Sequence, residues 1–230
     1  MITVARVLDD IDAMARIGAL PDGGVRRQAM SREAEQGRAY LAERMEEAGL
    51  AVRMDAAGNI IGRREADAPV PHQGAGTGER RVPAVLLGSH IDSISCGGNY
   101  DGVVGVFGAL ECVRTLNESG ISVGRPIEVI AFNDEEERFL GFLGSYALTG
   151  RLDPSDLADV RDAEGVLLVD AMREWGLDPE VIRRAERSVT DVFAFVELHI
   201  EQGPILEREG ASIGVVSLVK GNYRWEVTVE

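Results

Sequence analysis

Cysteine is scarce in this sequence, and long apolar runs are missing. The two cysteines, Cys96 and Cys112, lack the spacing of a metal-binding or redox motif. A disulfide framework is therefore not expected, which fits a reducing compartment. No apolar run reaches the roughly 20 residues of a membrane span, and no charged start followed by an apolar run marks a secretory leader. We expect a cytoplasmic protein with no membrane association.

Positive charge is also in short supply. Lysine and arginine total 24 against 39 aspartates and glutamates, so the net charge is −15. Binding to nucleic acid or to an anionic membrane surface depends on basic residues, so both partner classes are disfavoured. The simplest interpretation of the excess acid is solubility. The 230 residues are 45% hydrophobic, which is enough for one domain with a real core, or slightly more.

Hydrophobic periodicity predicts helices and strands in alternation. Helices are expected at 4–18, 31–49, 103–119 and 143–148, with two or three more within 155–187. Strands are expected at 84–90, 126–133 and 191–201, together with a hairpin over 50–65 that turns at 57–59. This order predicts an α/β fold with a mainly parallel sheet flanked by helices. Two more strands, at 211–219 and 224–230, suggest a second unit, so the expected domains are 1–210 and 211–230.

Ionisable side chains follow three of the predicted strands. They are His90 and Asp92 after the first, Asp134, Glu135 and Glu136 after the second, and Glu197, His199 and Glu201 at the end of the third; Asp101 opens a helix. Ligands gather at the carboxyl ends of parallel strands, and carboxylates placed side by side repel unless a cation lies among them. Imidazoles and carboxylates without thiolates suit Zn²⁺, Mn²⁺, Co²⁺ or Ni²⁺, and one Asp can bridge two such ions.

Each residue also has a simpler explanation. A single histidine after a strand is usually a satisfied polar residue, and an acidic run is usually a solvated loop. Gly97, Gly98 and Gly102 could simply form turns. We expect His72 to be exposed and without function, and Cys96 to be a bystander near the site. The hypothesis of a metal pair therefore depends on the joint pattern.

Several motifs resemble a known family. The stretches "GSHIDSISCGGNYDG", "EVIAFNDEEERF", "FLGSYALTG", "ELHIEQGPILE" and "IGVV" resemble the M20-type binuclear amidohydrolases. Within that superfamily they resemble the branch of N-carbamoyl-L-amino-acid hydrolases, allantoate amidohydrolases and β-ureidopropionases. Residues 23–65 resemble the N-terminal region of the same family. The resemblance covers nearly the whole chain.

The resemblance implies two divalent metal ions held by four ligands: His90, Asp101 as the bridge, Glu136 and His199. It also implies Glu135 as the general base and Asp92 as the residue that orients His90. The implied reaction hydrolyses a carbamoyl or ureido C–N bond of a small molecule and releases an amine, ammonia and carbon dioxide. Homodimerisation is implied for the full-length form.

The acidic run departs from the family pattern, because "EEERF" is one residue shorter than usual. Counting back from Arg138 and Phe139 names Asp134 and Glu135 as the functional pair. Counting forward from Ala131 and Phe132 names Glu135 and Glu136. We prefer the second register because the strand sets it and the loop can absorb a deletion.

A second departure concerns the end of the chain. The family has a lid and dimerisation domain after "RWEVTVE", and later a last histidine ligand, so 1–210 is expected to be an incomplete catalytic domain and 211–230 the start of that lid. An enzymatic alternative is an M20-type peptidase or N-deacylase. A rival of another class is a non-catalytic remnant that binds metal weakly. Neither the ureido substrate nor the metal follows from the sequence.

Overall fold

The computed structural model describes residues 1–68, 82–219 and 221. By its internal contacts the chain divides into two compact units, Met1–Ile200 and Glu201–Glu230. The helices are α1 (Val4–Ala15), α2 (Arg32–Glu47), α3 (Val103–Glu118), α4 (Leu143–Leu148), α5 (Pro154–Leu157), α6 (Leu168–Glu174) and α7 (Ile205–Glu209), with 3₁₀ helices η1 (Pro179–Ala185) and η2 (Val189–Asp191). The strands are β1 (Ala51–Met54), β2 (Ile60–Arg64), β3 (Ala84–His90), β4 (Ile127–Phe132) and β5 (Val192–Val196).

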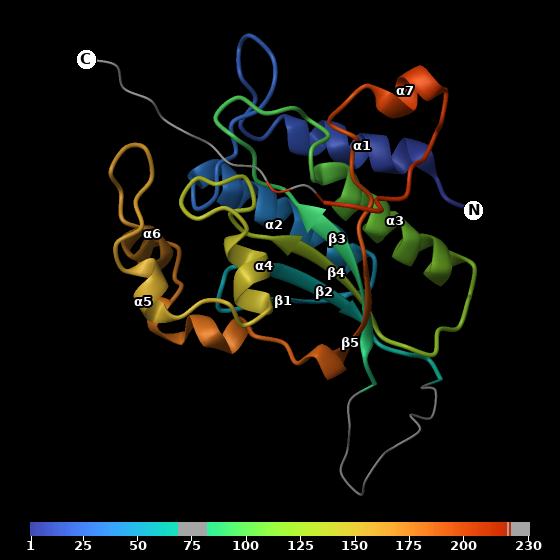
Figure 1. Ribbon diagram of the computed structural model, residues 1–230. Helices are drawn as coiled ribbons and strands as arrows, with labels where there is room; N and C mark the ends of the chain where they lie inside the picture. The colour runs from blue at the N-terminus through green and yellow to red at the C-terminus, as the bar shows by residue number, and fades with distance from the viewer. Residues whose placement is uncertain (69–81, 220, 222–230) are drawn as a thin grey trace, which may run out of the picture. The chain divides into compact units, whose positions relative to one another are not determined.

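The first unit is built on one five-stranded sheet of order β1-β2-β4-β3-β5 (Figure 1). Strands β4, β3 and β5 are parallel, as predicted. The hairpin β1–β2, also predicted, joins β4 in antiparallel fashion, so the sheet is mixed. Parallel neighbours need a crossover connection whereas a hairpin needs only a tight turn, and here α3 provides the crossover from β3 to β4. The predicted α/β class is confirmed.

Alternating residues of β4 pack on opposite faces of the sheet. Val129 and Ala131 belong to the core formed with helices α1, α2 and α3. Ile130 and Phe132 belong to a smaller cluster on the other face, where Leu148 of α4 packs. Figure 1 shows the same division, with α4 in front of the sheet and α3 behind it. Because both faces are covered, β4 is apolar at nearly every position, as is typical of a central strand.

Local signals set the ends of helix α2 as the sequence predicts. The Ser31 side chain accepts a hydrogen bond of 3.1 Å from the backbone N–H of Ala34. That N-cap satisfies one of the free donors of the first turn, and Glu33 and Glu35 there favour the positive end of the helix dipole. Beyond the helix Gly49 has φ +79°, the left-handed conformation that commonly ends a helix.

Two predicted strands differ from the structure. The strand expected at 191–201 ends at Val196, and the residues after it form an irregular loop. The strand expected at 211–219 is not formed. A strand needs a hydrogen-bonded neighbour, and the expected neighbour, 224–230, lies outside the described residues, as does His72. The domain boundary expected at 210–211 stays a prediction. No described helix combines the length and apolar character required to cross a membrane.

A buried carboxylate of β4 links three segments of the chain through ion pairs. Glu128 of β4 is 2% exposed, and it pairs with Arg63 of β2 at 2.7 Å and with Arg187 at 2.6 Å. Burial raises the pKa of Glu128, but the hydrogen bonds from the two arginines outweigh burial and leave the pKa below its ordinary value of 4.5. The folded state therefore favours the ionised carboxylate.

The Glu128→Gln variant tests this carboxylate. We expect the variant to lose about 2 kcal/mol of the free energy of unfolding at pH 7, because two partly buried arginines lose their counter-charge. Since the folded-state pKa is lowered, the stabilisation is fully present above the unfolded-state pKa and is lost as the pH falls through the folded-state value. The difference in unfolding free energy between the two proteins should therefore begin to shrink below about pH 4.5 and disappear only below the lower folded-state pKa of Glu128. Exposed Glu43→Gln is the control, and a difference that is constant with pH would contradict the assignment.

Gly88 of β3 lies where no side chain fits. Its φ is +148°, and a Cβ built there would lie 1.9 Å from the carbonyl oxygen of Ile130 on β4. We expect Gly88→Ala to lose about 3 kcal/mol or more, because the backbone of the central pair must move. Gly98→Ala is the matched control, since a Cβ there meets nothing within 4 Å. Chemical denaturation measures both, and equal stabilities for the two variants would overturn this explanation.

Candidate metal centre

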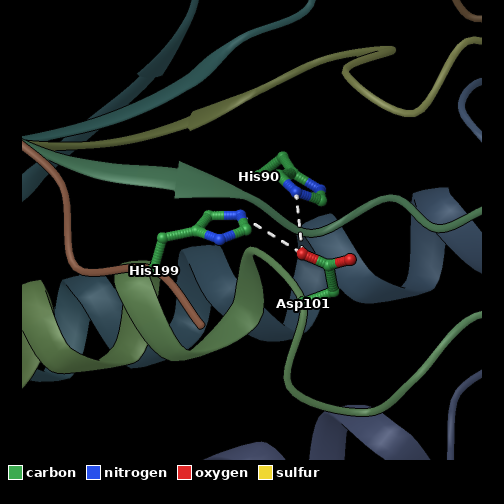
Figure 2. A group of neighbouring side chains, drawn as sticks. All are labelled: His90, Asp101 and His199. Carbon is green, nitrogen blue, oxygen red and sulfur yellow. Dashed lines mark ion pairs between the residues drawn. The ribbon is translucent and has the colours of Figure 1, made fainter. Parts of the chain in front are cut away.

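Two histidines and an aspartate meet at the carboxyl end of the parallel strands (Figure 2). His90 ends β3, His199 lies in the loop after β5, and Asp101 lies just before α3. Asp101 Oδ1 lies 3.9 Å from His90 Nε2 and 3.2 Å from His199 Nε2. The structure thus brings together three of the four predicted ligands around one carboxylate oxygen.

Both imidazole rings turn the same nitrogen towards Asp101. His90 Nδ1 lies 3.0 Å from the backbone carbonyl of Asp92, and His199 Nδ1 lies 2.9 Å from that of Ile200. A carbonyl only accepts hydrogen bonds, so each Nδ1 carries the proton. The unprotonated Nε2 atoms are then free to bind a cation, which is the arrangement typical of metal-bound histidines.

Gly102 lets the start of helix α3 approach the His90 ring. Its φ is +65°, and a Cβ at this position would lie 2.4 Å from His90 Nε2 and from Cδ2. Any side chain would therefore strike the ring at the atom that faces Asp101. The sequence alone allowed Gly102 to be an ordinary turn residue; its packing against His90 follows only from the structure.

The acidic run after β4 divides into two functions. Asp134 is fully buried, and its carboxylate accepts hydrogen bonds from the backbone N–H groups of Arg138, Phe139 and Leu140. It shapes the loop. Glu135 and Glu136 instead form a close group with His90, and Glu135 Oε2 lies 3.4 Å from His90 Nε2. This placement favours the register that pairs Glu135 with Glu136.

Asp92 contacts both sides of the centre. Its backbone carbonyl is the atom that accepts from His90, whereas its carboxylate Oδ1 lies 3.8 Å from His90 Nδ1. Its Oδ2 accepts a hydrogen bond of 3.0 Å from the Glu136 backbone N–H. Asp92 therefore connects the loop after β3 to the loop after β4, and its backbone carbonyl is the group within hydrogen-bond distance of the His90 ring.

The carboxylates of the centre are in an environment that disfavours their charge. Burial raises the pKa of Asp92 to about 7, and the Glu136 N–H offsets only part of this shift. Burial also raises the pKa of Glu135 and of Glu136; His90 lowers each in part, while neighbouring carboxylates raise it further. Asp92 Oδ1 is buried without a hydrogen-bond partner. A cluster of this kind is stabilised in its ionised form by a bound cation.

The donor set fits divalent metal ions. One group of potential ligand atoms comprises His90, Asp101 and His199, and a second comprises His90, Glu135 and Glu136, each group lying within 4.8 Å. All donors are imidazole nitrogens or carboxylate oxygens, the set that suits Zn²⁺, Mn²⁺, Co²⁺ or Ni²⁺.

The other charged residues after β5 have different partners. Ser89 donates a hydrogen bond to the Glu197 carboxylate, across from the end of β5. Glu201 belongs to the second unit, where it accepts from the backbone N–H groups of Ile205 and Leu206 at the start of α7. Glu135 and Glu197 both line an open groove of about 930 Å³, so both face solvent. Sequence reasoning missed Ser89, because a serine within a strand carries no distinctive signal.

Comparison with known proteins is consistent with this geometry. The family model of peptidase family M28 matches residues 72–201. The N-carbamoyl-L-amino acid amidohydrolase of Geobacillus stearothermophilus is 43% identical over 223 residues, which is 96% of this chain and 52% of that protein. The allantoate amidohydrolase of Bacillus subtilis is 36% identical over 226 residues, 97% of this chain and 52% of that protein.

A solved structure agrees with these sequence matches. A hydantoinase/carbamoylase family amidase from Burkholderia ambifaria superposes with a TM-score of 0.78 at 40% identity, over 91% of this chain and 48% of that one. The chain thus spans about half the length of the curated relatives it matches. The predicted branch is confirmed, although the matching family model is M28 where the motifs resemble the M20 type. Because that model spans more than half of the residues, the chain belongs to peptidase family M28, in the M28/M20-like group that includes the hydantoinase/carbamoylase amidohydrolases.

Proposed function

We propose that the protein is a metal-dependent amidohydrolase, or the N-terminal portion of one, that hydrolyses the C–N bond of a carbamoyl or ureido group. The observation that carries this proposal is the meeting of two imidazole Nε2 atoms at one oxygen of Asp101, with Glu135 beside His90. The substrates named by the relatives support the class: an N-carbamoyl-L-amino acid and allantoate. β-Ureidopropionate is a third substrate of this class.

In this proposal His90, Asp101, Glu136 and His199 are the residues that would hold two divalent ions. When bound, such ions supply Lewis-acid chemistry that acidifies water and polarises a carbonyl. Glu135 is the general base: its carboxylate takes a proton from the attacking water and then delivers it to the leaving nitrogen. In the metal-free chain burial and the negative neighbours raise the pKa of Glu135, and bound cations would act in the opposite direction.

The net reaction balances with one water. The ureido group R–NH–CO–NH₂ and water give the amine R–NH₂, carbon dioxide and ammonia. Asp92 keeps His90 in position during these steps, because its carbonyl accepts from His90 Nδ1. Homodimerisation of a longer form, the cytoplasmic location and the domain division at 210–211 stay predictions.

A second candidate is a peptidase or N-deacylase that uses the same cluster. The observation in its favour is the match of residues 72–201 to a peptidase family. The two candidates differ in their products, because a ureido substrate releases ammonia whereas an N-acyl substrate releases only an amine and an acid. Ammonia assays with N-carbamoyl amino acids and allantoate, run beside amine assays with dipeptides and N-acetyl amino acids, separate them.

The number of ions is the first testable point. We expect the 230-residue chain to retain two ions after dialysis against excess Zn²⁺ or Mn²⁺ and then against buffer. His199→Ala should lose one of them, because His199 belongs to one ligand group, and His90→Ala should weaken both, because His90 belongs to both groups. Atomic absorption on the purified chain measures the ratio. Cys96→Ser is the control, since Cys96 is exposed and belongs to neither ligand group. One ion in the unmodified chain would mean that the second position is incomplete without the later histidine ligand, and none would contradict a metal centre in this chain.

Glu135→Gln tests the general base. We expect turnover of a ureido substrate to fall by about 10²- to 10⁴-fold, the usual contribution of a positioned acid–base group, while the metal content stays unchanged. Glu137→Gln, in the same loop but in neither ligand group, is the matched control. Loss of metal on Glu135→Gln, with metal retained on Glu136→Gln, would instead support the register that pairs Asp134 with Glu135. If the unmodified chain hydrolyses the ureido substrate no faster than the metal-free blank, that result would support the non-catalytic rival.

A further inference from the structure

We propose that Arg27 is a positioning residue of the metal centre, which holds the loop after β3 so that His90 presents Nε2 to the metal. This inference rests on the proposed function only in taking His90 as a ligand. Arg27 lies 63 residues before His90 in the sequence, next to Arg26, and the pair "RR" in a glycine-rich stretch looks like surface charge. The structure places it elsewhere: its side chain is 1% exposed, among the most buried large side chains that the structure describes.

The guanidinium of Arg27 joins the loop after β3 to the end of helix α1. Its Nε donates to the carbonyl of Ile91 at 2.6 Å. Its Nη1 donates to the carbonyls of Met14 and Ile17, both at 2.9 Å. Met14 lies in the last turn of α1 and Ile17 in the turn that follows the helix, where acceptors are left over and a cation is favoured. Among the described residues, no carboxylate forms an ion pair with Arg27.

The main chain of Arg27 binds the same loop at the residue that follows Asp92 in the sequence. Its N–H donates to Ser93 Oγ at 2.9 Å, and its carbonyl accepts from the Ser93 N–H at 3.1 Å. Two residues earlier, Val25 exchanges both backbone hydrogen bonds with Gly97, at 2.9 and 3.0 Å. The segment 25–27 thus runs along the loop, and Arg27 forms hydrogen bonds with the two residues that flank Asp92.

Asp92 connects the loop residues that Arg27 binds to the proposed ligand His90. Its carbonyl accepts from His90 Nδ1, and its Oδ2 accepts from the Glu136 N–H. If residues 91–93 shift, the carbonyl that sets the tautomer and direction of the His90 ring shifts with them. The positive charge of Arg27 also interacts with the Asp92 carboxylate. Arg27 therefore supports both the geometry and the charge of a residue that touches both ligand loops.

An arginine is specifically suited to this position. Its planar fork serves three carbonyls at once, which a lysine ammonium on a flexible stem does not reproduce. Burial lowers the pKa of Arg27 to about 10, so the group stays charged at neutral pH. Room for its stem comes from Gly37 of α2, where a Cβ would lie 2.9 Å from Arg27 Cδ and 3.3 Å from Met14 Sδ.

The test compares substitutions of the two adjacent arginines. Arg27→Lys and Arg27→Met remove the fork, and Arg26→Met is the control for loss of a neighbouring positive charge, because Arg26 is exposed and its Nε donates to the carbonyl of Ser95. Competition with a chromogenic chelator measures the Co²⁺ or Zn²⁺ affinity, and urea unfolding measures stability. We expect about a 10- to 100-fold loss of affinity for the Arg27 variants, as for other groups that orient metal ligands, and less than a twofold change for Arg26→Met.

Two further variants separate positioning from stability. Gly37→Ala improves the helix propensity of α2 but displaces the Arg27 stem, so it should lower metal affinity although Arg27 is intact. Leu41→Ala removes a fully buried core side chain of α2 and should lower stability without changing metal affinity. If Arg27→Met fails to fold, then Arg27→Lys and Gly37→Ala decide the question.

A direct readout is available in the metal-free chain. Nitrogen-15 spectra of the imidazoles report the protonated nitrogen of each ring, and we expect the His90 signals, but not those of His199, to move toward a mixture of tautomers in the Arg27 variants. Unchanged His90 signals together with unchanged metal affinity would overturn the proposal, as would an equal loss of affinity in Leu41→Ala. If the unmodified chain binds no metal, the proposed function fails, while the His90 signals still decide the role of Arg27.

Discussion

The parallel pairing of β3 with β4 is the constraint on which the site depends. Its register sets His90 opposite Phe132, so both strands deliver the loops that follow them to the same edge of the sheet. Gly88 allows this pair to approach, and Gly102 allows the next helix to begin directly against the imidazole ring. A slip of one residue would turn His90 to the other face of the sheet. Strand register thus brings the ends of the two strands together, and the loops that follow them carry the remaining residues of the site.

Some carboxylates of the first unit fall into two contrasting classes. Glu111 and Glu128 have arginine partners, whose hydrogen bonds outweigh burial and lower their pKa. Among the residues that the structure describes, no arginine forms an ion pair with Asp92, Glu135 or Glu136, so burial prevails and their pKa is raised. Structural ion pairs and functional sites both perturb titration, but in opposite directions here. A divalent ion would stabilise the ionised form of the second class of carboxylates, as arginine does for the first.

Arg27 brings a positive charge close to the site without belonging to the group of candidate ligands. The guanidinium donates its hydrogen bonds to main-chain carbonyls and belongs to neither group of candidate ligands. An arginine among the ligands would compete with a metal for the carboxylates. Held by the carbonyls, the charge offsets that of Asp92 and leaves the ligand atoms open. The N-terminal segment thereby takes part in the site although no proposed ligand comes from it.

Much of this protein follows from its sequence, because the signals are local. Hydrophobic periodicity, the Ser31 cap and the turn at residues 57–59 predict the helices and the hairpin, and the family motifs predict the same site residues that the structure groups around His90. Other features depend on partners distant in the chain. The end of β5, the missing strand at 211–219, the separation of Asp134 from Glu135 and the burial of Arg27 depend on which backbone groups find a partner. The sequence by itself therefore determined most of the elements and the set of candidate site residues, and only tertiary structure decided which carboxylates lie beside His90 and that Arg27 is buried, since hydrogen bonding and desolvation arise when distant segments meet.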